Sequence, residues 1–105
     1  MEQPNLSYIE NLSGGDKSFE QKLIAIIKKE FPEEKKNYFE NISASNYKLT
    51  AENVHKLKHK ISILGLEKSY EIAMAFENNL LEENTTLQTE FESILTIITN
   101  YLHKL

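Results

Sequence analysis

Apolar residues recur along this 105-residue chain at helical spacing. They lie three or four positions apart, as on the buried face of an amphipathic helix, rather than alternating as in a strand. The sequence has no Asn-Gly or Asp-Gly pair, the usual mark of a tight β-hairpin. The pattern therefore predicts an all-α protein.

Breaks in this pattern divide the chain into one short helix and four long ones. The short helix carries Leu6, Ile9 and Leu12 behind Pro4, and Ser13-Gly14-Gly15 ends it. Asp16 is placed to cap a long second helix, which Pro32 is expected to kink but not divide. The apolar stripe of that second helix contains Phe19, Leu23, Ile26, Ile27, Phe31, Tyr38, Phe39 and Ile42.

Three further helices follow after the polar stretch 43–49. The third is predicted from an N-cap at Thr50 to about Leu64, where Gly65 ends it or lets a neighbour approach. The fourth runs from near Leu66 to Leu80, and the break at residues 82–86 puts Thr85 and Gln88 in capping-box register. The last carries Leu87, Phe91, Ile94, Leu95, Ile98, Tyr101, Leu102 and Leu105.

Short connections make consecutive helices antiparallel neighbours. We therefore expect a single domain over residues 1–105, an up-down four-helix bundle with a short extra helix at its N-terminus. The five phenylalanines lie at helical spacing and are expected in the core: Phe19, Phe31, Phe39, Phe76 and Phe91.

Composition narrows the classes of function. The chain has no cysteine, which excludes disulfides and thiolate chemistry. It has no arginine and a net charge of −4, which argues against nucleic-acid binding. No apolar run is long enough to cross a bilayer, and the start lacks the basic and apolar regions of a signal peptide. We expect a cytoplasmic protein without membrane insertion.

The third predicted helix carries the candidate chemistry. Val54, Leu57, Ile61 and Leu64 lie within roughly 80° of arc, at about 100° per residue. His55 then points about 140° from the middle of that arc and His59 roughly opposite to it, so both imidazoles should face solvent. Lys58 and Ser62 are expected on the same side as His55.

Charge gathers around these histidines. Residues 48–60 contain four lysines and one glutamate, a net +3 in a protein of net −4. A neutral imidazole nitrogen is a nucleophile near neutral pH, and lysines attract a phosphoryl group and offset its charge. This combination suits a histidine that accepts a phosphoryl group. The sequence has no glycine-rich nucleotide loop and no Ser/His/Asp set.

One segment resembles the histidine-containing phosphotransfer (HPt) domains of bacterial multistep phosphorelays. It is Val54-His55-Lys56-Leu57-Lys58-His59-Lys60-Ile61-Ser62-Ile63-Leu64-Gly65. The family pattern is histidine, any residue, leucine, lysine, glycine, with another glycine about six residues on. The stretch Leu12–Asp16, Phe31-Pro32 and Phe76-Glu77 also look like family features. The departure is His59, which stands where the family usually has a small residue.

The resemblance implies a role for each matching residue. His55 would carry the phosphoryl group on Nε2, Lys58 would stabilise it, and Leu57 would be core. Partners would be response-regulator receiver domains, including those of hybrid sensor histidine kinases. The receivers would supply Mg²⁺, so the chain itself would need no cofactor and would not act on ATP. We expect a monomer.

Other residues are docking candidates. Lys56 and Lys60 supply an attractive field, and His59 and Ser62 border the acceptor. Tyr8, expected to face outward while Ile9 and Leu12 face the bundle, is a further docking candidate.

Two alternatives stay open. A degenerate bundle would dock a receiver without carrying phosphate. A metal site would use Glu52, His55 and His59, which share one helix face.

Overall fold

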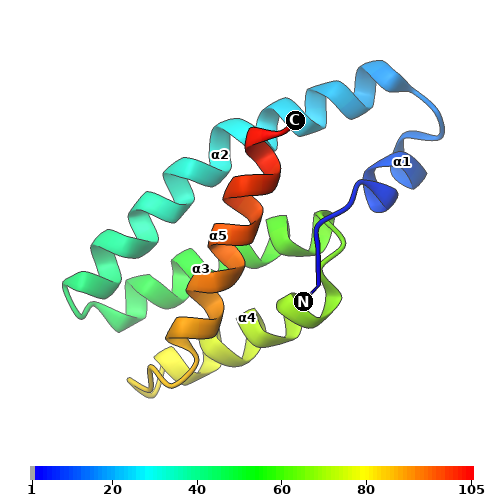
Figure 1. Cartoon of the computed structure of the whole chain (residues 1–105). Helices are drawn as coiled ribbons and strands as arrows, with labels where there is room; N and C mark the ends of the chain where they lie inside the picture. The colour runs from blue at the N-terminus through cyan, green and yellow to red at the C-terminus, as the bar shows by residue number, and fades with distance from the viewer. Residues whose placement is uncertain (1) are drawn as a thin grey trace.

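Five helices account for most of the chain in a computed structural model, which describes residues 2–105 (Figure 1). They are α1 (Ser7–Ser13), α2 (Lys17–Ser43), α3 (Tyr47–Ile63), α4 (Glu67–Leu80) and α5 (Gln88–His103). Within the described residues there is no strand, so the all-α prediction is confirmed. None of these helices is both long and apolar enough to cross a membrane.

The contacts between helices follow chain order. α3 packs against α2 on one side and α4 on the other, α5 packs against α4 and α2, and α1 packs against α2. The molecule measures 43 × 23 × 19 Å. Its long dimension matches α2, because 27 residues at about 1.5 Å per residue extend about 40 Å.

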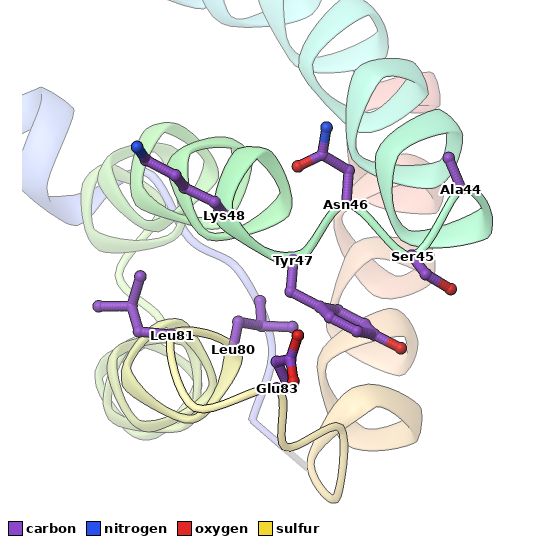
Figure 2. A pocket seen from close by; sticks show the side chains of 8 residues that line it. All are labelled: Ala44, Ser45, Asn46, Tyr47, Lys48, Leu80, Leu81 and Glu83. Carbon is purple, nitrogen blue, oxygen red and sulfur yellow. The ribbon is translucent and has the colours of Figure 1, made fainter.

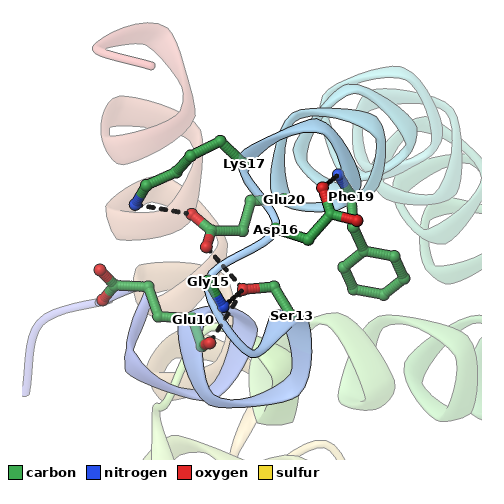
Figure 3. A network of polar contacts seen from close by, with 7 residues as sticks. All are labelled: Glu10, Ser13, Gly15, Asp16, Lys17, Phe19 and Glu20. Atoms are coloured by element: carbon green, nitrogen blue, oxygen red, sulfur yellow. Dashed lines mark hydrogen bonds and ion pairs between the residues drawn. The ribbon is translucent and has the colours of Figure 1, made fainter.

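Pro32 lies within α2, which continues through it as the sequence predicts. At the start of this helix the Asp16 carboxylate accepts a hydrogen bond from the Phe19 backbone N–H at 3.1 Å, so the predicted cap is confirmed. Close by, the Ser13 hydroxyl donates to Glu20 at 2.6 Å across the turn (Figure 3). That bond, aided by Lys17, lowers the pKa of Glu20. The turn between α1 and α2 is thus held by side chains from both helices.

Two other predicted caps are wrong. α3 begins at Tyr47 and is capped by Asn46, whose side chain accepts from the Leu49 N–H. Thr50 is buried, and its hydroxyl donates to the Asn46 carbonyl instead. α5 begins at Gln88 without a side-chain cap, so Thr85 does not cap it, and the Gln88 amide donates to Glu92 one turn on instead of forming a capping box.

The core is built around a group of aromatic rings. Tyr38, Phe76 and Phe91 are fully buried, with centroids 5.2 Å apart for Tyr38–Phe91 and for Phe76–Phe91. The Tyr38 hydroxyl donates to Glu92 at 3.0 Å. Burial, together with the Glu92 carboxylate, raises the pKa of Tyr38. These rings join α2, α4 and α5.

Two phenylalanines predicted in the core are not there. Phe19 and Phe39 are 40 % and 38 % exposed, whereas Phe31, Phe76 and Phe91 are buried. Tyr38 takes the inward position because it lies seven residues after Phe31, two helical turns along the same face. Leu12 is also exposed, although Ile9 beside it is buried as expected.

Gly65 fulfils both predicted roles. It follows α3 with a φ of +78°, a conformation that glycine adopts without strain. A Cβ there would lie 2.6 Å from Asn5 Nδ2, because the N-terminal segment crosses at this point. Asn5 also donates its backbone N–H to the Leu64 carbonyl at 2.8 Å, which ties the N-terminal segment to the end of α3.

Candidate functional site

His55 lies on the outer side of α3, and its side chain is 52 % exposed. Its Nδ1 is 3.0 Å from Glu77 Oε2 on α4. A carboxylate only accepts hydrogen bonds, so Nδ1 carries the proton and donates it. In a neutral ring with this tautomer, Nε2 keeps its lone pair. The contact therefore orients the imidazole and, in its neutral form, makes Nε2 the nitrogen with the free lone pair.

Lys58 forms an ion pair with the same carboxylate. Its Nζ lies 2.9 Å from Glu77 Oε1, and its side chain is only 11 % exposed. The ammonium also lies 5.7 Å from the centroid of the Tyr70 ring on α4, within cation–π range. Lys58 is thus on the His55 side of α3, as predicted, but it is buried against α4 rather than directed to solvent. The reason is its position about 80° from the centre of the apolar arc, where α4 covers it.

His55, Lys58 and Glu77 together form what we call the α4 flank. Glu77 accepts from the imidazole with one oxygen and pairs with the ammonium through the other. A single carboxylate thus connects the candidate nucleophile to the nearest buried cation.

The opposite side of α3 carries a second set of charges, the α2 flank. Lys60 Nζ lies 2.8 Å from Glu30 Oε1 and 3.2 Å from Glu34 Oε2, and its side chain is 13 % exposed. Burial alone would lower the pKa of Lys60, but the hydrogen bonds to both carboxylates outweigh it and raise the pKa overall. The hydrogen bond from Lys60 likewise lowers the pKa of Glu30.

These pairings reduce the positive field predicted around His55. Lys58 and Lys60 are each matched by carboxylates from neighbouring helices. Lys48 and Lys56 are exposed, and within residues 2–105 neither forms an ion pair. Lys48 and Lys56 line the hollow beside His55, together with Glu52.

His59 is exposed beside His55, as predicted. The two ring centroids are 4.8 Å apart and the planes meet at 72°, an edge-to-face arrangement. Among residues 2–105, no three His, Asp or Glu side chains are placed to hold a metal ion together. The geometry therefore gives the metal alternative of Glu52, His55 and His59 no support.

A shallow surface hollow lies beside His55 between α3 and α4. It has a volume of about 350 Å³, and its lining residues are Lys48, Ala51, Glu52, His55, Lys56, Glu77 and Leu81. Lys48 and Leu81 also line a second hollow at the α2–α3 turn, where Tyr47 and Leu80 meet (Figure 2). The two hollows share these residues and therefore adjoin along α3.

The remaining docking candidates lie elsewhere. Tyr8 is half-exposed on α1, which packs against α2 rather than beside the α4 flank. Ser62 lines a different hollow with Glu67, Tyr70, Glu71 and Met74. The structure therefore gathers His55, Lys56, Lys58 and His59 on one side of α3, with Ser62 one turn beyond Lys58 and His59, and leaves Tyr8 on a different helix.

Glu77 is the residue to which the sequence assigned no role. The HPt resemblance includes Phe76-Glu77 as a feature of the fourth helix, without a function for the carboxylate. Its 22-residue separation from His55 conceals the pairing, which exists only because α3 and α4 pack side by side.

Comparisons with known proteins leave the chain without a family. No family model matches it, and neither a curated protein nor a solved structure does.

Proposed function

We propose that this protein is a histidine phosphotransfer domain in which His55 accepts a phosphoryl group from a receiver aspartate and passes it to another. The observation that carries the proposal is the Nδ1–Glu77 contact on a half-exposed ring. It fixes the tautomer in which Nε2 is the nucleophile, and the exposure gives an incoming phosphoryl group access.

The transfer balances without an additional acid or base. The Nε2 lone pair attacks phosphorus, the bond from phosphorus to the aspartyl oxygen breaks, and the aspartate leaves as a carboxylate. Nδ1 keeps its proton, so the phosphorylated ring gains positive charge beside Glu77. The Glu77 carboxylate stabilises that charge, as a carboxylate stabilises an imidazolium in a catalytic triad. The reverse sequence returns the phosphoryl group to a second aspartate.

Lys58 has two roles in this proposal. In the resting protein it pairs with Glu77 and so helps to hold the carboxylate against His55. After transfer, its flexible stem allows the ammonium to turn from Glu77 toward the phosphoryl oxygens, one turn along the helix. Lys56, exposed beside the hollow, adds attraction for the incoming group.

The proposal includes a specific architecture and setting. We take α2 to α5 as an antiparallel up-down bundle with α1 appended, supported by packing between consecutive helices and between α2 and α5. The partners are bacterial response-regulator receivers, including those of hybrid sensor kinases, which supply Mg²⁺. The protein acts in the cytoplasm as a monomeric carrier and has no activity of its own toward ATP.

The test is phosphorylation of the full chain by two donors. Phosphoramidate and a receiver domain charged with acetyl phosphate are each mixed with wild type, His55→Gln and His103→Gln. We expect both donors to label wild type and His103→Gln, with the label on Nε2 by NMR, and neither to label His55→Gln. His103 is a matched control because it is an exposed histidine in the last turn of α5.

Other outcomes would replace the proposal. Equal labelling of His55→Gln would exclude His55 as the acceptor. Binding of the receiver without labelling by either donor would favour the alternative of a docking bundle that carries no phosphate.

A further inference from the structure

His59 lies beside the proposed acceptor, and the transfer step does not use it. Its ring meets that of His55 edge to face at 4.8 Å between centroids. It is exposed, and within residues 2–105 it takes part in no ion pair or side-chain hydrogen bond. Its ring nitrogens are therefore available to a group that arrives at His55.

The orientation of His55 directs its phosphoryl-bearing nitrogen to this side. Nδ1 engages Glu77 on α4, and the two nitrogens of an imidazole project from opposite edges of the ring. Nε2 is consequently turned away from α4. On α3, His59 lies about 40° farther round the helix from α4 than His55 does. A group on Nε2 thus extends toward the sector of α3 that His59 occupies.

We infer that His59 donates a ring N–H to a phosphoryl oxygen on His55 Nε2, so that a proton on His59 and the phosphoryl group on His55 stabilise each other. This inference rests on the proposed function. It makes phosphoryl occupancy sensitive to pH, because imidazole side chains gain and lose a proton in the physiological range. Protonated His59 favours the phosphorylated state, and the effect weakens as the proton is lost.

The carboxylates that the neighbouring helices place beside α3 already have partners. Glu77 on α4 is paired with His55 and Lys58, and Glu30 and Glu34 on α2 are paired with Lys60. On α3 itself the neighbouring ionisable residues are Glu52, Lys56 and Lys60. The carboxylates of α2 and α4 are therefore not free to bind a His59 N–H, and a phosphoryl group on His55 is the new negative charge beside it.

NMR titration of the histidine side chains tests the inference on the wild-type chain. The chain is charged with phosphoramidate, and the His59 and His103 resonances are followed from about pH 5 to 8 with and without the phosphoryl group. His59→Gln assigns the His59 signals. We expect phosphorylation to raise the proton affinity of His59 about two- to fivefold and to leave that of His103 unchanged.

Salt separates direct contact from a distant field. A hydrogen bond keeps the His59 shift at about 0.5 M salt, where interactions between separated surface charges are screened. Phosphorylation of His55 with an unmoved His59 midpoint, or with a shift that salt abolishes, overturns this inference and leaves the proposed function standing. Absence of phosphate on His55, or phosphate on His59 instead, overturns both.

Discussion

Lysine–glutamate ion pairs lie on both sides of α3, in the α4 flank and in the α2 flank, but the two flanks differ in what else they contain. On each, a lysine from α3 is nearly buried and paired with carboxylate from a neighbouring helix, Lys58 with Glu77 and Lys60 with Glu30 and Glu34. Only the α4 flank includes a histidine. The α2 flank is a closed ion-pair cluster, whereas the α4 flank shares its carboxylate with a half-exposed nucleophile. A buried lysine–glutamate pair by itself therefore indicates only that two helices pack together. The imidazole beside such a pair is the feature that indicates a reactive site.

The largest expected difference between the flanks is in phosphorylation rate. Glu77→Gln keeps an acceptor near Nδ1 but removes the negative charge that offsets the phosphorylated ring. We expect the initial rate of His55 labelling by phosphoramidate to fall about tenfold to a hundredfold, by analogy with the loss of a carboxylate that orients a metal-ligating histidine. Phosphate incorporation measured by intact-mass spectrometry gives the rate.

Glu34→Gln is the matched control for this change, because it removes the same charge from the other flank. Its labelling rate should equal that of wild type. Similar losses in the two variants would mean that the flanks do not differ as argued, and circular dichroism at the assay temperature would show whether either variant has unfolded.

A smaller effect concerns stability. Lys60→Met keeps the apolar stem of the side chain and leaves Glu30 and Glu34 without their shared cation. Glu34 Oε1 is buried with no hydrogen-bond partner in the structure, so loss of Lys60 leaves this carboxylate still less satisfied. We expect the free energy of unfolding at pH 7 to fall by about 1–2 kcal/mol. Urea denaturation measures it, and a variant as stable as wild type would show that the α2 flank is not a stabilising contact.

The smallest expected effect is the loss, at alkaline pH, of the contribution that Lys60 makes to the free energy of unfolding. Lys60 has a raised pKa in the folded state, so its contribution is complete below the ordinary value of 10.5 and is lost as pH rises through the folded value. The difference in unfolding free energy between wild type and Lys60→Met should stay constant up to about pH 10 and shrink above it.

Tyr38 also has a raised pKa and loses its contribution in the same direction, but it is present in both proteins and cancels in the difference. Urea titrations between pH 7 and 11 make the comparison. A difference that grew with pH would contradict the assigned direction of the Lys60 shift.

Much of the fold follows from local rules that can be applied to the sequence. Asp16 caps α2 because a short carboxylate can reach free N–H groups at any helix start. Thr50 is not the cap of α3 because Asn46, an equally good N-cap residue, begins that helix four residues earlier, and α5 begins after Leu87 without any side-chain cap, so Thr85 caps nothing. Phe39 was misplaced because Tyr38, one residue earlier, takes the buried position on the face of Phe31. Periodicity gives the spacing of an apolar stripe but not how much of it the neighbouring helices cover, and Phe19 lies on an uncovered part.

For the candidate site, the sequence by itself determined that His55 and His59 would stand on the outer side of one helix. That result depends only on the angle between residues along a single helix axis. The tertiary structure alone decided what those rings meet. Glu77 is 22 residues from His55 and Glu30 is 30 residues from Lys60, so only the packing of α4 and α2 against α3 brings them within hydrogen-bond distance. Lys58 shows the limit of what helical angle can predict. A residue midway between the core and solvent faces is buried or exposed according to whether a neighbouring helix covers it.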